Sequence, residues 1–437
     1  MRKTRFAVVG ALGIAAALTL SACSGGGSSS NSASIGSTNG KGKTLTVWVM
    51  TGDLSNTTLA AINKQFTKET GAKVKVETQQ WANITTKLTT ALAGSNPPDV
   101  IDIGNTQVPT FAATGGLMDL TKYKSQLEQG QTWLGGLVDP ATVDGSLYAV
   151  PSFAGTRAVI YNKKTWAAAG VTTAPTSYSQ LTADLNKVKA ANPSPDFSTF
   201  YMPGQYWYAG LQFVWDAGGQ IATGSGTNWK AGFSSSGAQK GLNEFKTFQN
   251  NYSSVASQTL DTDTPSQDTI FANGQTSAIL GNSWEIGVIQ QDNKAITNDD
   301  LGTFPMPGTS GKNQPVLLAG SDWGIAQKSK NQSLALDYTK IAASPSIQKS
   351  YVFGKDGWIP NSTQTVKAAQ SSGLTDLQKG FFEASLISKS TPAAANWATI
   401  EGDNSITQFF QSVTTGSSSP SAAASTFDAH VESVLNK

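Results

Sequence analysis

Hydrophobic residues recur at two different spacings after residue 44. Residues 45–49 form a short apolar run that is typical of a buried strand. Leu59, Ile62 and Phe66 follow at intervals of three and four, which places them on one face of a helix. Gly71 comes just after this stretch and is expected to end the helix.

The same succession is then repeated. Residues 73–77 alternate between Val and charged side chains, which is the period of a strand. Leu88 and Leu92 indicate a helix, and two prolines at 97–98 break it before an apolar strand at 100–103. A β-α-β-α-β order predicts an α/β protein with a largely parallel sheet and helices on both faces. In such sheets, ligands bind at the carboxyl ends of the strands.

Farther along the chain the pattern remains α/β. Residues 148–150 and 158–161 are predicted strands, and Leu181, Leu185 and Val188 indicate a helix. We find no repeat of about 20–50 residues, which argues against a solenoid. Two stretches rich in Gly, Ser and Asn are expected to be loops, residues 222–228 and 308–314.

The N-terminal residues indicate the compartment. Three basic residues lie among the first five and precede an apolar run at 6–20, which is typical of a secretory signal and is shorter than the roughly twenty residues of a membrane span. The run ends in Leu-Ser-Ala before Cys23, which resembles the lipobox of bacterial lipoproteins. We predict a signal peptide at 1–22 and a lipidated, flexible Ser/Gly linker at 23–43. The alternative is an unmodified cysteine behind an ordinary cleavage site.

Composition narrows the function classes. The chain has 437 residues, enough for about two or three domains. Lys and Arg number 31 against 29 Asp and Glu, which gives a net charge of +2. A charge this small does not indicate a protein that binds nucleic acid. Cys23 and His430 are the only cysteine and histidine, which argues against disulfide frameworks, zinc sites and Ser-His-Asp hydrolases. Residues 224–226 lack the third glycine of a dinucleotide fingerprint, and we predict no cofactor and no metal.

Aromatic residues in polar surroundings are the main candidate chemistry. An aromatic face suits the C–H face of a pyranose, and neighbouring polar side chains can hold the hydroxyls. For any one of these residues taken alone, packing in the core is the favoured interpretation. Carboxylates are scattered, so an enzyme with a glycosidase-type pair stays open as an alternative. The aromatic residues are Trp81, Tyr206, Trp207, Tyr208, Trp215, Trp284, Trp358 and Trp397.

A series of short blocks resembles the extracellular solute-binding proteins of ABC carbohydrate importers, the family that includes maltose-binding protein. The blocks are LTVW at 45–48, TGAKV at 70–74, PDV at 98–100, GLMDL at 116–120, DGSLYAVP at 144–151, YNK at 161–163, FANGQ at 271–275, GNSW at 281–284 and AGSDW at 319–323. Within the family, four stretches are most similar to actinomycete proteins that bind amino-sugar disaccharides such as N,N'-diacetylchitobiose: GNTQV at 104–108, YMPGQ at 201–205, WEIG at 284–287 and PAAANWATIE at 392–401.

The resemblance implies a two-lobed periplasmic-binding-protein fold of type II, with a cleft that closes on the ligand by a hinge motion. The chain is expected to cross between the lobes near residues 154, 304 and 350. The expected N-terminal lobe is residues 44–154 plus 305–350, and the C-terminal lobe is residues 155–304 plus 351–437.

The resemblance also assigns roles to aromatic residues. Trp284 matches the position where related proteins stack an aromatic on the sugar, and Trp397 matches a second platform near the C-terminus. Tyr206 and Tyr208 fall where the family places an acid and an aromatic beside the ligand. The acid is absent here, which weakens the case for Tyr206 as a hydrogen-bonding residue.

Polar positions carry over in the same way. Asp53 follows the first strand, where the family accepts bonds from sugar hydroxyls. Asn105 and Thr106 follow the third strand, where maltose binders use a charged pair, and this neutral pair favours a different ligand. Ser321 and Asp322 are expected in a loop that frequently faces the cleft in relatives.

Three further residues have two interpretations each. Arg157 either donates to a sugar oxygen or pairs with an acid in the hinge. Trp81 either contacts the ligand or packs within its lobe. Glu285 either contacts the ligand or serves as a structural cap or ion-pair partner.

The predicted function is therefore a non-enzymatic binding component of an importer. It would capture a neutral di- or oligosaccharide and deliver it to ABC permease subunits driven by a cytoplasmic ATPase. It would act as a monomer, held at the outer face of the cytoplasmic membrane by a lipid on Cys23. The alternatives are a secreted carbohydrate-active enzyme and a binding protein for another solute class.

Overall fold

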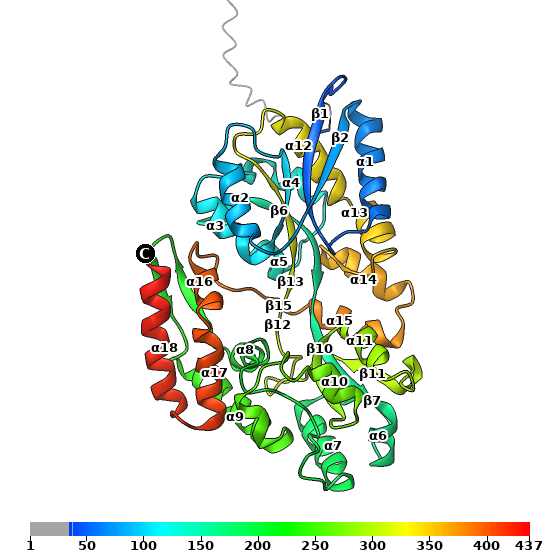
Figure 1. The fold of residues 1–437 in the computed structure, drawn as a ribbon, viewed down its shortest axis with the longest axis vertical. Helices are drawn as coiled ribbons and strands as arrows, with labels where there is room; N and C mark the ends of the chain where they lie inside the picture. Colours follow the sequence, from blue (N-terminus) through cyan, green and yellow to red (C-terminus); the bar gives the residue numbers. More distant parts are fainter. Residues whose placement is uncertain (1–34, 37) are drawn as a thin grey trace, which may run out of the picture. The chain divides into compact units, whose positions relative to one another are not determined.

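Two separate β-sheets organise the chain (Figure 1). The computed structural model describes residues 35–36 and 38–437. We call the six-stranded sheet with its helices the N-lobe and the three-stranded sheet with its helices the C-lobe. The larger sheet has the order β14 (Ile359–Pro360), β6 (Ala149–Gly155), β13 (Ala319–Ile325), β3 (Val100–Gly104), β1 (Thr44–Met50) and β2 (Lys73–Gln79). The smaller sheet has the order β10 (Ala278–Asn282), β7 (Arg157–Asn162) and β11 (Leu301–Phe304).

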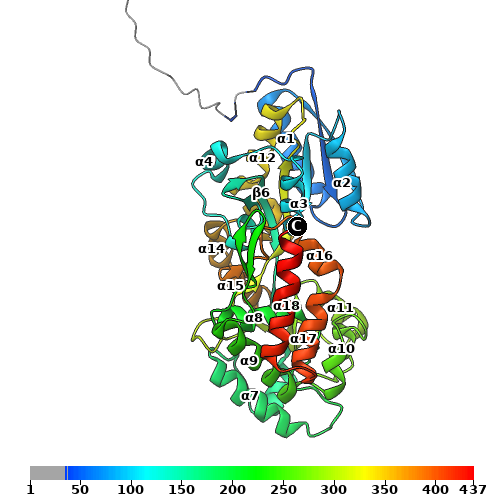
Figure 2. The same ribbon diagram turned by 90° about the vertical axis from the view of Figure 1, so that its left-hand side faces the viewer.

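Helices surround each sheet, and Figure 2 shows α17 and α18 side by side along the C-lobe. The N-lobe contains α1 (Asn56–Thr70), α2 (Ile84–Ala93), α3 (Val108–Ala113), α4 (Lys124–Glu128), α12 (Gln332–Ala342) and α13 (Pro345–Ile347). The C-lobe contains α6 (Lys163–Ala168), α7 (Tyr178–Ala191), α8 (Trp207–Asp216), α9 (Ser236–Tyr252), α10 (Gln267–Ala272), α11 (Glu285–Asp292), α15 (Asp376–Ser385), α16 (Trp397–Gly402), α17 (Ser405–Thr415) and α18 (Pro420–Leu435). Two helices lie where the lobes join, α5 (Gly135–Val138) and α14 (Thr363–Ser371).

The first elements of the N-lobe follow directly from the local sequence. Strands β1, β2 and β3 and helices α1 and α2 occur where the hydrophobic spacing predicts them, so these predictions are confirmed. The Ser55 side chain accepts a hydrogen bond from the Thr58 backbone N–H and caps the start of α1. Gly71 ends α1 with a φ of 75°, a conformation that glycine adopts without a Cβ clash. The elements in this part of the chain are thus specified by short-range signals.

The six-stranded sheet is mixed rather than largely parallel, which corrects the prediction. Strands β2, β1 and β3 are parallel, as predicted. Strand β13 lies antiparallel between β3 and β6, and β14 is antiparallel to β6. The reason is topological, because β13 enters the N-lobe from the C-lobe and therefore runs in the opposite direction.

A hairpin stands where a loop was predicted. Strands β8 (Ala222–Ser225) and β9 (Asn228–Ala231) pair antiparallel, and together they include the predicted loop at 222–228. The hairpin is held against the end of α18, since Asn436 accepts from the Trp229 backbone N–H at 2.6 Å. These are long-range contacts, and the local Gly- and Ser-rich sequence gives no indication of them.

The main chain passes between the lobes at the ends of both sheets. Strand β6 leads directly into β7, and β11 is followed by β12 (Val316–Leu317) and then β13. The last passage lies beyond residue 350, because β14 still pairs with β6 in the larger sheet. Buried residues at the crossings form a hydrophobic cluster of their own, which includes Ala154, Ile160 and Leu318. The lobes are thus joined by packed strands rather than by a loose linker.

Helices α8 and α9 make a close contact in the core of the C-lobe. Gly241 of α9 is buried directly against the backbone of α8. A Cβ atom at this position would overlap the Phe213 backbone oxygen and the Val214 Cα atom. Backbone atoms cannot move aside as a side chain does, so the two helices can approach this closely only with glycine at position 241.

We predict that Gly241→Ala lowers the free energy of unfolding by about 1–3 kcal/mol through overpacking. The matched control is Gly287→Ala in α11, where an added Cβ would meet no heavy atom within 4 Å. That variant should gain roughly 0.5–1 kcal/mol from its better helix propensity. Urea unfolding followed by circular dichroism measures both, and equal effects of the two changes would contradict the packing argument.

Candidate functional site

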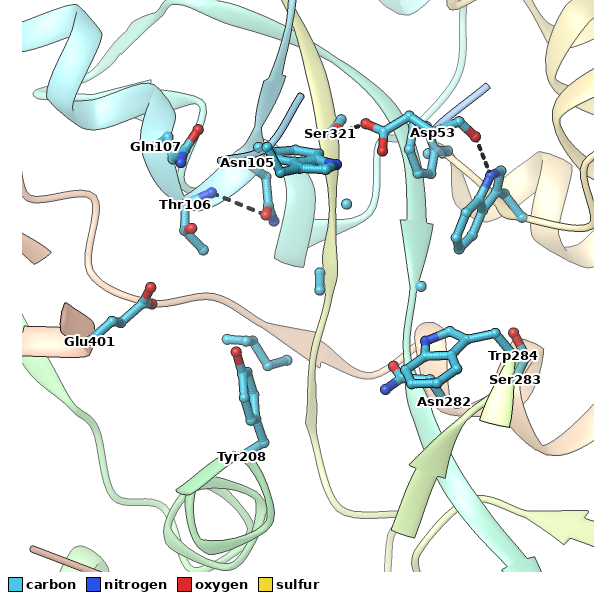
Figure 3. A pocket seen from close by; sticks show the side chains of 18 residues that line it. Asp53, Asn105, Thr106, Gln107, Tyr208, Asn282, Ser283, Trp284, Ser321 and Glu401 are labelled. Carbon is cyan, nitrogen blue, oxygen red and sulfur yellow. Dashed lines mark hydrogen bonds between the residues drawn. The ribbon is translucent and has the colours of Figure 1, made fainter. Parts of the chain in front are cut away.

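A cavity of about 340 Å³ lies between the two sheets and is lined from both lobes (Figure 3). The N-lobe contributes Asp53, Trp81, Gly104, Asn105, Thr106, Gln107, Phe153, Ser321 and Trp358. The C-lobe contributes Tyr208, Asn282, Ser283, Trp284 and Glu401. The crossing segments form the floor with Gly155, Leu317, Ala319 and Gly320. The volume falls within the usual range for small-molecule sites.

Asp53 is the charged group on the N-lobe wall. It follows β1 at the carboxyl end of the sheet, and its Oδ2 accepts a hydrogen bond from the Ser321 hydroxyl at 2.6 Å. Its backbone oxygen accepts from the Trp358 indole N–H at 2.6 Å. These bonds fix both the loop after β1 and the direction of the carboxylate. Asp53, Ser321 and Trp358 therefore form one connected group on this wall.

A second carboxyl group lies beneath Asp53. Asp102 of β3 is fully buried and accepts from the Met50 backbone N–H at 3.1 Å. Burial raises the pKa of Asp53 to about 6, an effect that the bond from Ser321 partly offsets. Burial, together with the nearby charge of Asp53, also raises the pKa of Asp102 well above its usual value. Asp53 therefore titrates closer to neutrality than an exposed aspartate does.

The two residues after β3 differ in what they offer to the cavity. The Asn105 amide N–H group donates to the Leu318 oxygen at 3.0 Å, and its Oδ1 accepts from the Thr106 backbone at 3.0 Å. Asn105 is therefore largely used in tying the loop to the crossing strand. Thr106 is half-buried, and its side chain borders the cavity.

Two tryptophans on different lobes expose large aromatic surfaces. Trp284, at the start of α11, is 58% exposed, and Trp81 is 42% exposed. The Trp81 indole N–H donates to the Thr51 backbone oxygen at 3.2 Å, which holds the ring at the N-lobe wall. Trp358 packs against Phe153 with ring centroids 4.9 Å apart. Both walls thus present apolar faces beside polar groups, which is what a ligand with flat apolar faces and polar edges requires.

Arg157 and Tyr206 lie behind the cavity wall rather than on it. Tyr206 is buried, and its hydroxyl donates to the Leu280 oxygen at 3.0 Å. The Arg157 Nε–H group donates to the same hydroxyl at 2.8 Å. Neither residue lines the cavity, whereas Tyr208, which packs against both, does. The cavity thus does not include Arg157 and Tyr206, and ligand contact by either stays a prediction.

Trp397 also lies behind the wall, which corrects the prediction of a second stacking platform. It is fully buried in the C-lobe core, so neither ring face is accessible. Its indole N–H donates to Glu401 Oε1 at 2.5 Å, one helical turn later on α16. Glu401 borders the cavity, and burial raises its pKa above the usual value. At this part of the wall the group that faces the cavity is therefore the carboxylate of Glu401, a residue that the sequence analysis did not predict, and not the ring of Trp397.

Asp322 and Glu285 are buried as well. Side chains alternate along a strand, and Ser321 faces the cavity, so Asp322 on β13 is turned away from it. Burial raises the pKa of Asp322 well above its usual value. Glu285 accepts from the Asn282 backbone N–H at 2.7 Å and from the Gln267 amide at 2.6 Å. It shapes the turn that carries Trp284, which is the structural role considered for it.

The cavity therefore unites seven of the predicted ligand-binding residues. These are Asp53, Trp81, Asn105, Thr106, Tyr208, Trp284 and Ser321. Sequence reasoning missed Gln107, Asn282, Ser283 and Glu401 as lining side chains, although each lies within a stretch that carries the family resemblance. Ligand contact by any of these residues stays a prediction.

Some predictions fall outside this site. Cys23 and the predicted signal peptide at 1–22 lie outside the residues that the structure describes. Within the described part of the chain, no helix is long and apolar enough to cross a membrane. The described residues also contain no group of three His, Cys, Asp or Glu side chains arranged to hold a metal ion.

Comparisons with known proteins agree with this architecture. The chain is similar to the diacetylchitobiose binding protein DasA of Streptomyces coelicolor, with 36% identity over 434 residues that cover 98% of each chain. The sugar-binding protein MalE from Xanthomonas citri matches with a TM-score of 0.78 at 23% identity, covering 90% of this chain and 97% of that one. MalE from Listeria monocytogenes, in complex with maltose, matches with a TM-score of 0.75 at 19% identity, covering 89% and 97%.

The two structural matches show that the predicted two-lobed periplasmic-binding-protein fold is correct. The family model for bacterial extracellular solute-binding proteins matches residues 51–349, more than half of the chain. Together with the relative matched over its whole length, this shows that the chain belongs to the bacterial extracellular solute-binding proteins.

Proposed function

We propose that this protein captures a neutral di- or oligosaccharide, one that contains N-acetylglucosamine, and delivers it to the permease of an ABC importer. The observation that carries the proposal is the cavity between the lobes, where exposed tryptophans lie beside hydrogen-bonding groups. Trp284 and Trp81 offer faces for the apolar side of a pyranose, while Asp53, Thr106 and Glu401 offer acceptors for its hydroxyl groups. The end-to-end similarity to a diacetylchitobiose binding protein supports the choice of sugar.

The charges around the cavity support a ligand without negative charge. Asp53 and Glu401 are the ionisable acids among the lining residues, and no lysine, arginine or histidine accompanies them there. An anionic ligand would meet two carboxyl groups in a partly desolvated space, which is unfavourable. A polyol with many O–H donors suits such acceptors.

Closure of the lobes would complete the site. A ligand that touches both walls favours the conformation in which the walls are near each other. Polar contacts outside the cavity support such a state. The Thr110 hydroxyl donates to the Ala395 oxygen at 2.8 Å, and the Gly226 backbone N–H donates to Asp144 at 2.9 Å, in each case between lobes. We propose that the permease recognises this closed form and that the protein works as a monomer.

The anchor completes the proposal. A diacylglyceryl group on Cys23, followed by the Ser/Gly-rich stretch after it, would hold the protein at the outer face of the cytoplasmic membrane. The prediction of a flexible linker up to residue 43 extends too far, because Ile35 is buried in the N-lobe core and the Gly40 backbone N–H donates to the Thr70 oxygen at 2.7 Å. Mass spectrometry of the N-terminal peptide from cells tests this part separately. An unmodified Cys23 would overturn the anchoring without affecting the proposal of sugar binding.

The first test is a titration of the full chain, purified in a mild detergent, with N,N'-diacetylchitobiose, cellobiose, maltose and xylobiose. We expect calorimetry to give a saturable response to diacetylchitobiose with a Kd in the micromolar range or below, about 8 kcal/mol of binding. The sugar should be recovered intact. A shortened sugar would favour the enzyme alternative, and no response to any sugar would favour another solute class.

We predict that Trp284→Ala weakens diacetylchitobiose binding about tenfold or more. The substitution removes an exposed aromatic face, and the loss of stacking should cost about 1–2 kcal/mol of binding free energy. The protein should still fold, since Trp284 is 58% exposed. Val255→Ala is the control, because that side chain is also an exposed hydrophobic group of the C-lobe, 78% exposed, and lies away from the cavity. Equal affinities of the two variants would remove Trp284 from the site.

We predict that sugar affinity falls about tenfold between pH 7.5 and pH 5, because protonation of a carboxyl group with a pKa near 6 removes an acceptor for sugar hydroxyls. Near pH 6, binding should release protons, which calorimetry detects by comparing buffers with different ionisation heats. Asp53→Asn should flatten the pH profile. An unchanged profile in that variant would show that another group is responsible.

Stability of the ligand-free protein should change in the opposite direction with pH. The pKa of Asp53 is raised from 3.8 to about 6 in the folded state, so folding disfavours its ionised form. Its contribution to stability is present below pH 4 and is lost as the pH rises through about 6. The difference in unfolding free energy between Asp53→Asn and the unmodified chain isolates this contribution.

A further inference from the structure

Arg157 occupies an unusual environment. Arg2, Arg5 and Arg157 are the arginines of the chain, and Arg157 alone lies among the residues that the structure describes. It stands at the start of β7, where its Cα pairs in register with that of Asn282 in β10. Asn282 leads into the turn that carries Ser283 and Trp284. The guanidinium group therefore lies one layer behind the cavity wall.

The two roles suggested for Arg157 by the sequence do not fit this environment. It does not line the cavity, so it does not donate to a ligand there. None of the ion pairs among the described residues includes it, so it is not one half of a hinge salt bridge. Its Nη1 is buried and has no hydrogen-bond partner in the described part of the chain. Glu285 acts on the guanidinium charge from a distance, but no carboxylate among the described residues forms an ion pair with it. A partly desolvated cation of this kind is costly, and its retention calls for another explanation.

The aromatic ring of Tyr208 provides that explanation. The Arg157 Cζ atom lies 3.7 Å from the centroid of the Tyr208 ring. The Trp207 ring is stacked on the same tyrosine, with centroids 3.7 Å apart and planes at 24°. Two groups at this distance cannot share one face of a ring without overlapping, so they cover opposite faces. Both faces of Tyr208 are thus occupied by protein.

This arrangement leaves only the edge and the hydroxyl group of Tyr208 for a ligand. The residue is half-buried and lines the cavity, and Figure 3 shows its hydroxyl pointing into it. This hydroxyl donates to no other described residue, and the Arg157 guanidinium beside it partly offsets the rise in the Tyr208 pKa that burial causes. A covered ring whose hydroxyl can still donate its proton at a cavity is suited to hydrogen bonding and not to stacking.

We propose that Arg157 is a positioning residue, which clamps Tyr208 against Trp207 so that the tyrosine hydroxyl forms a hydrogen bond with the bound sugar. The inference rests on the proposed function and names a specificity-determining contact within it. Tyr208 supplies a polar contact in place of the stacking role that its aromatic character suggests.

The neighbouring bonds explain why arginine is required at this position. The Nε–H group donates to the Tyr206 hydroxyl, which in turn donates to the Leu280 oxygen of β10, so the guanidinium plane is fixed at one edge. Its planar face is then free to stack on Tyr208, which the tetrahedral ammonium group of lysine cannot do.

The test is a double-mutant cycle on the full chain in detergent, with N,N'-diacetylchitobiose as the probe. Tyr208→Phe keeps the ring and removes the hydroxyl, and we expect it to weaken binding about 3- to 10-fold, as for the loss of one hydrogen bond. Arg157→Lys should weaken binding to a similar extent. The double variant should bind no more weakly than the weaker of the two single variants, because a hydroxyl that is no longer positioned contributes nothing further.

Two controls separate positioning from general damage. Tyr201→Phe removes another C-lobe tyrosine hydroxyl that lacks a partner and lies away from this cavity, and it should leave affinity unchanged. The ultraviolet difference spectrum on sugar binding should contain a tyrosine band that disappears in Tyr208→Phe and weakens in Arg157→Lys. Should Arg157→Lys fail to fold, Arg157→Met, which retains a long unbranched side chain without charge, takes its place in the cycle.

The outcomes discriminate between the proposals. Full affinity in Tyr208→Phe would overturn the hydroxyl contact, and full affinity in Arg157→Lys would overturn the clamp. Losses that add in the double variant would show that Arg157 acts independently of Tyr208 and would also overturn the clamp. Absence of sugar binding by the unmodified chain would overturn the proposed function, and this inference with it.

Discussion

The pairing of β6 with β13 is the constraint on which the rest of the structure depends. These strands carry the chain between the lobes and also form the floor of the cavity through Gly155, Ala319 and Gly320. A Cβ at Gly320 would overlap the Phe153 oxygen, so the strands can lie this close only with glycine there. The register of β13 shifts between Ser321 and Asp322. Its alternation then turns the serine toward the cavity and the aspartate into the protein.

Each cavity wall has a second layer that fixes the first. Trp397 holds Glu401, Glu285 holds the Asn282 backbone, and Arg157 packs on Tyr208. Trp397 and Glu285 are buried, whereas the residues they hold, Glu401 and Asn282, are half-buried. Such support matters for binding, because a side chain that is already held in place loses little conformational entropy when a ligand arrives.

This layering explains why the fold can be predicted from the sequence more completely than the site. The spacing of Leu59, Ile62 and Phe66 depends only on near neighbours, and the helix that it predicts is present. The direction of β13 depends on which lobe the chain comes from. The hydrophobic pattern within the strand does not indicate this direction. For the site, tryptophan and arginine stand out in a sequence, and Trp397 and Arg157 were predicted as contacts although they form the inner layer. Glu401 lies at the end of a stretch that carries the family resemblance, one turn after Trp397, but a single glutamate in a predicted helix does not stand out as a binding residue.

The two layers also account for the electrostatics of the cavity. The only arginine in the described residues lies behind Tyr208 and does not line the cavity. Asp53 and Glu401 are partly desolvated, and burial raises the pKa of each above its usual value. The cavity is thereby rich in hydrogen-bonding groups and weak in net charge. A surface of this kind gains little from an ion and much from a neutral polyol, because every matched hydroxyl satisfies a group that would otherwise remain desolvated and unpaired.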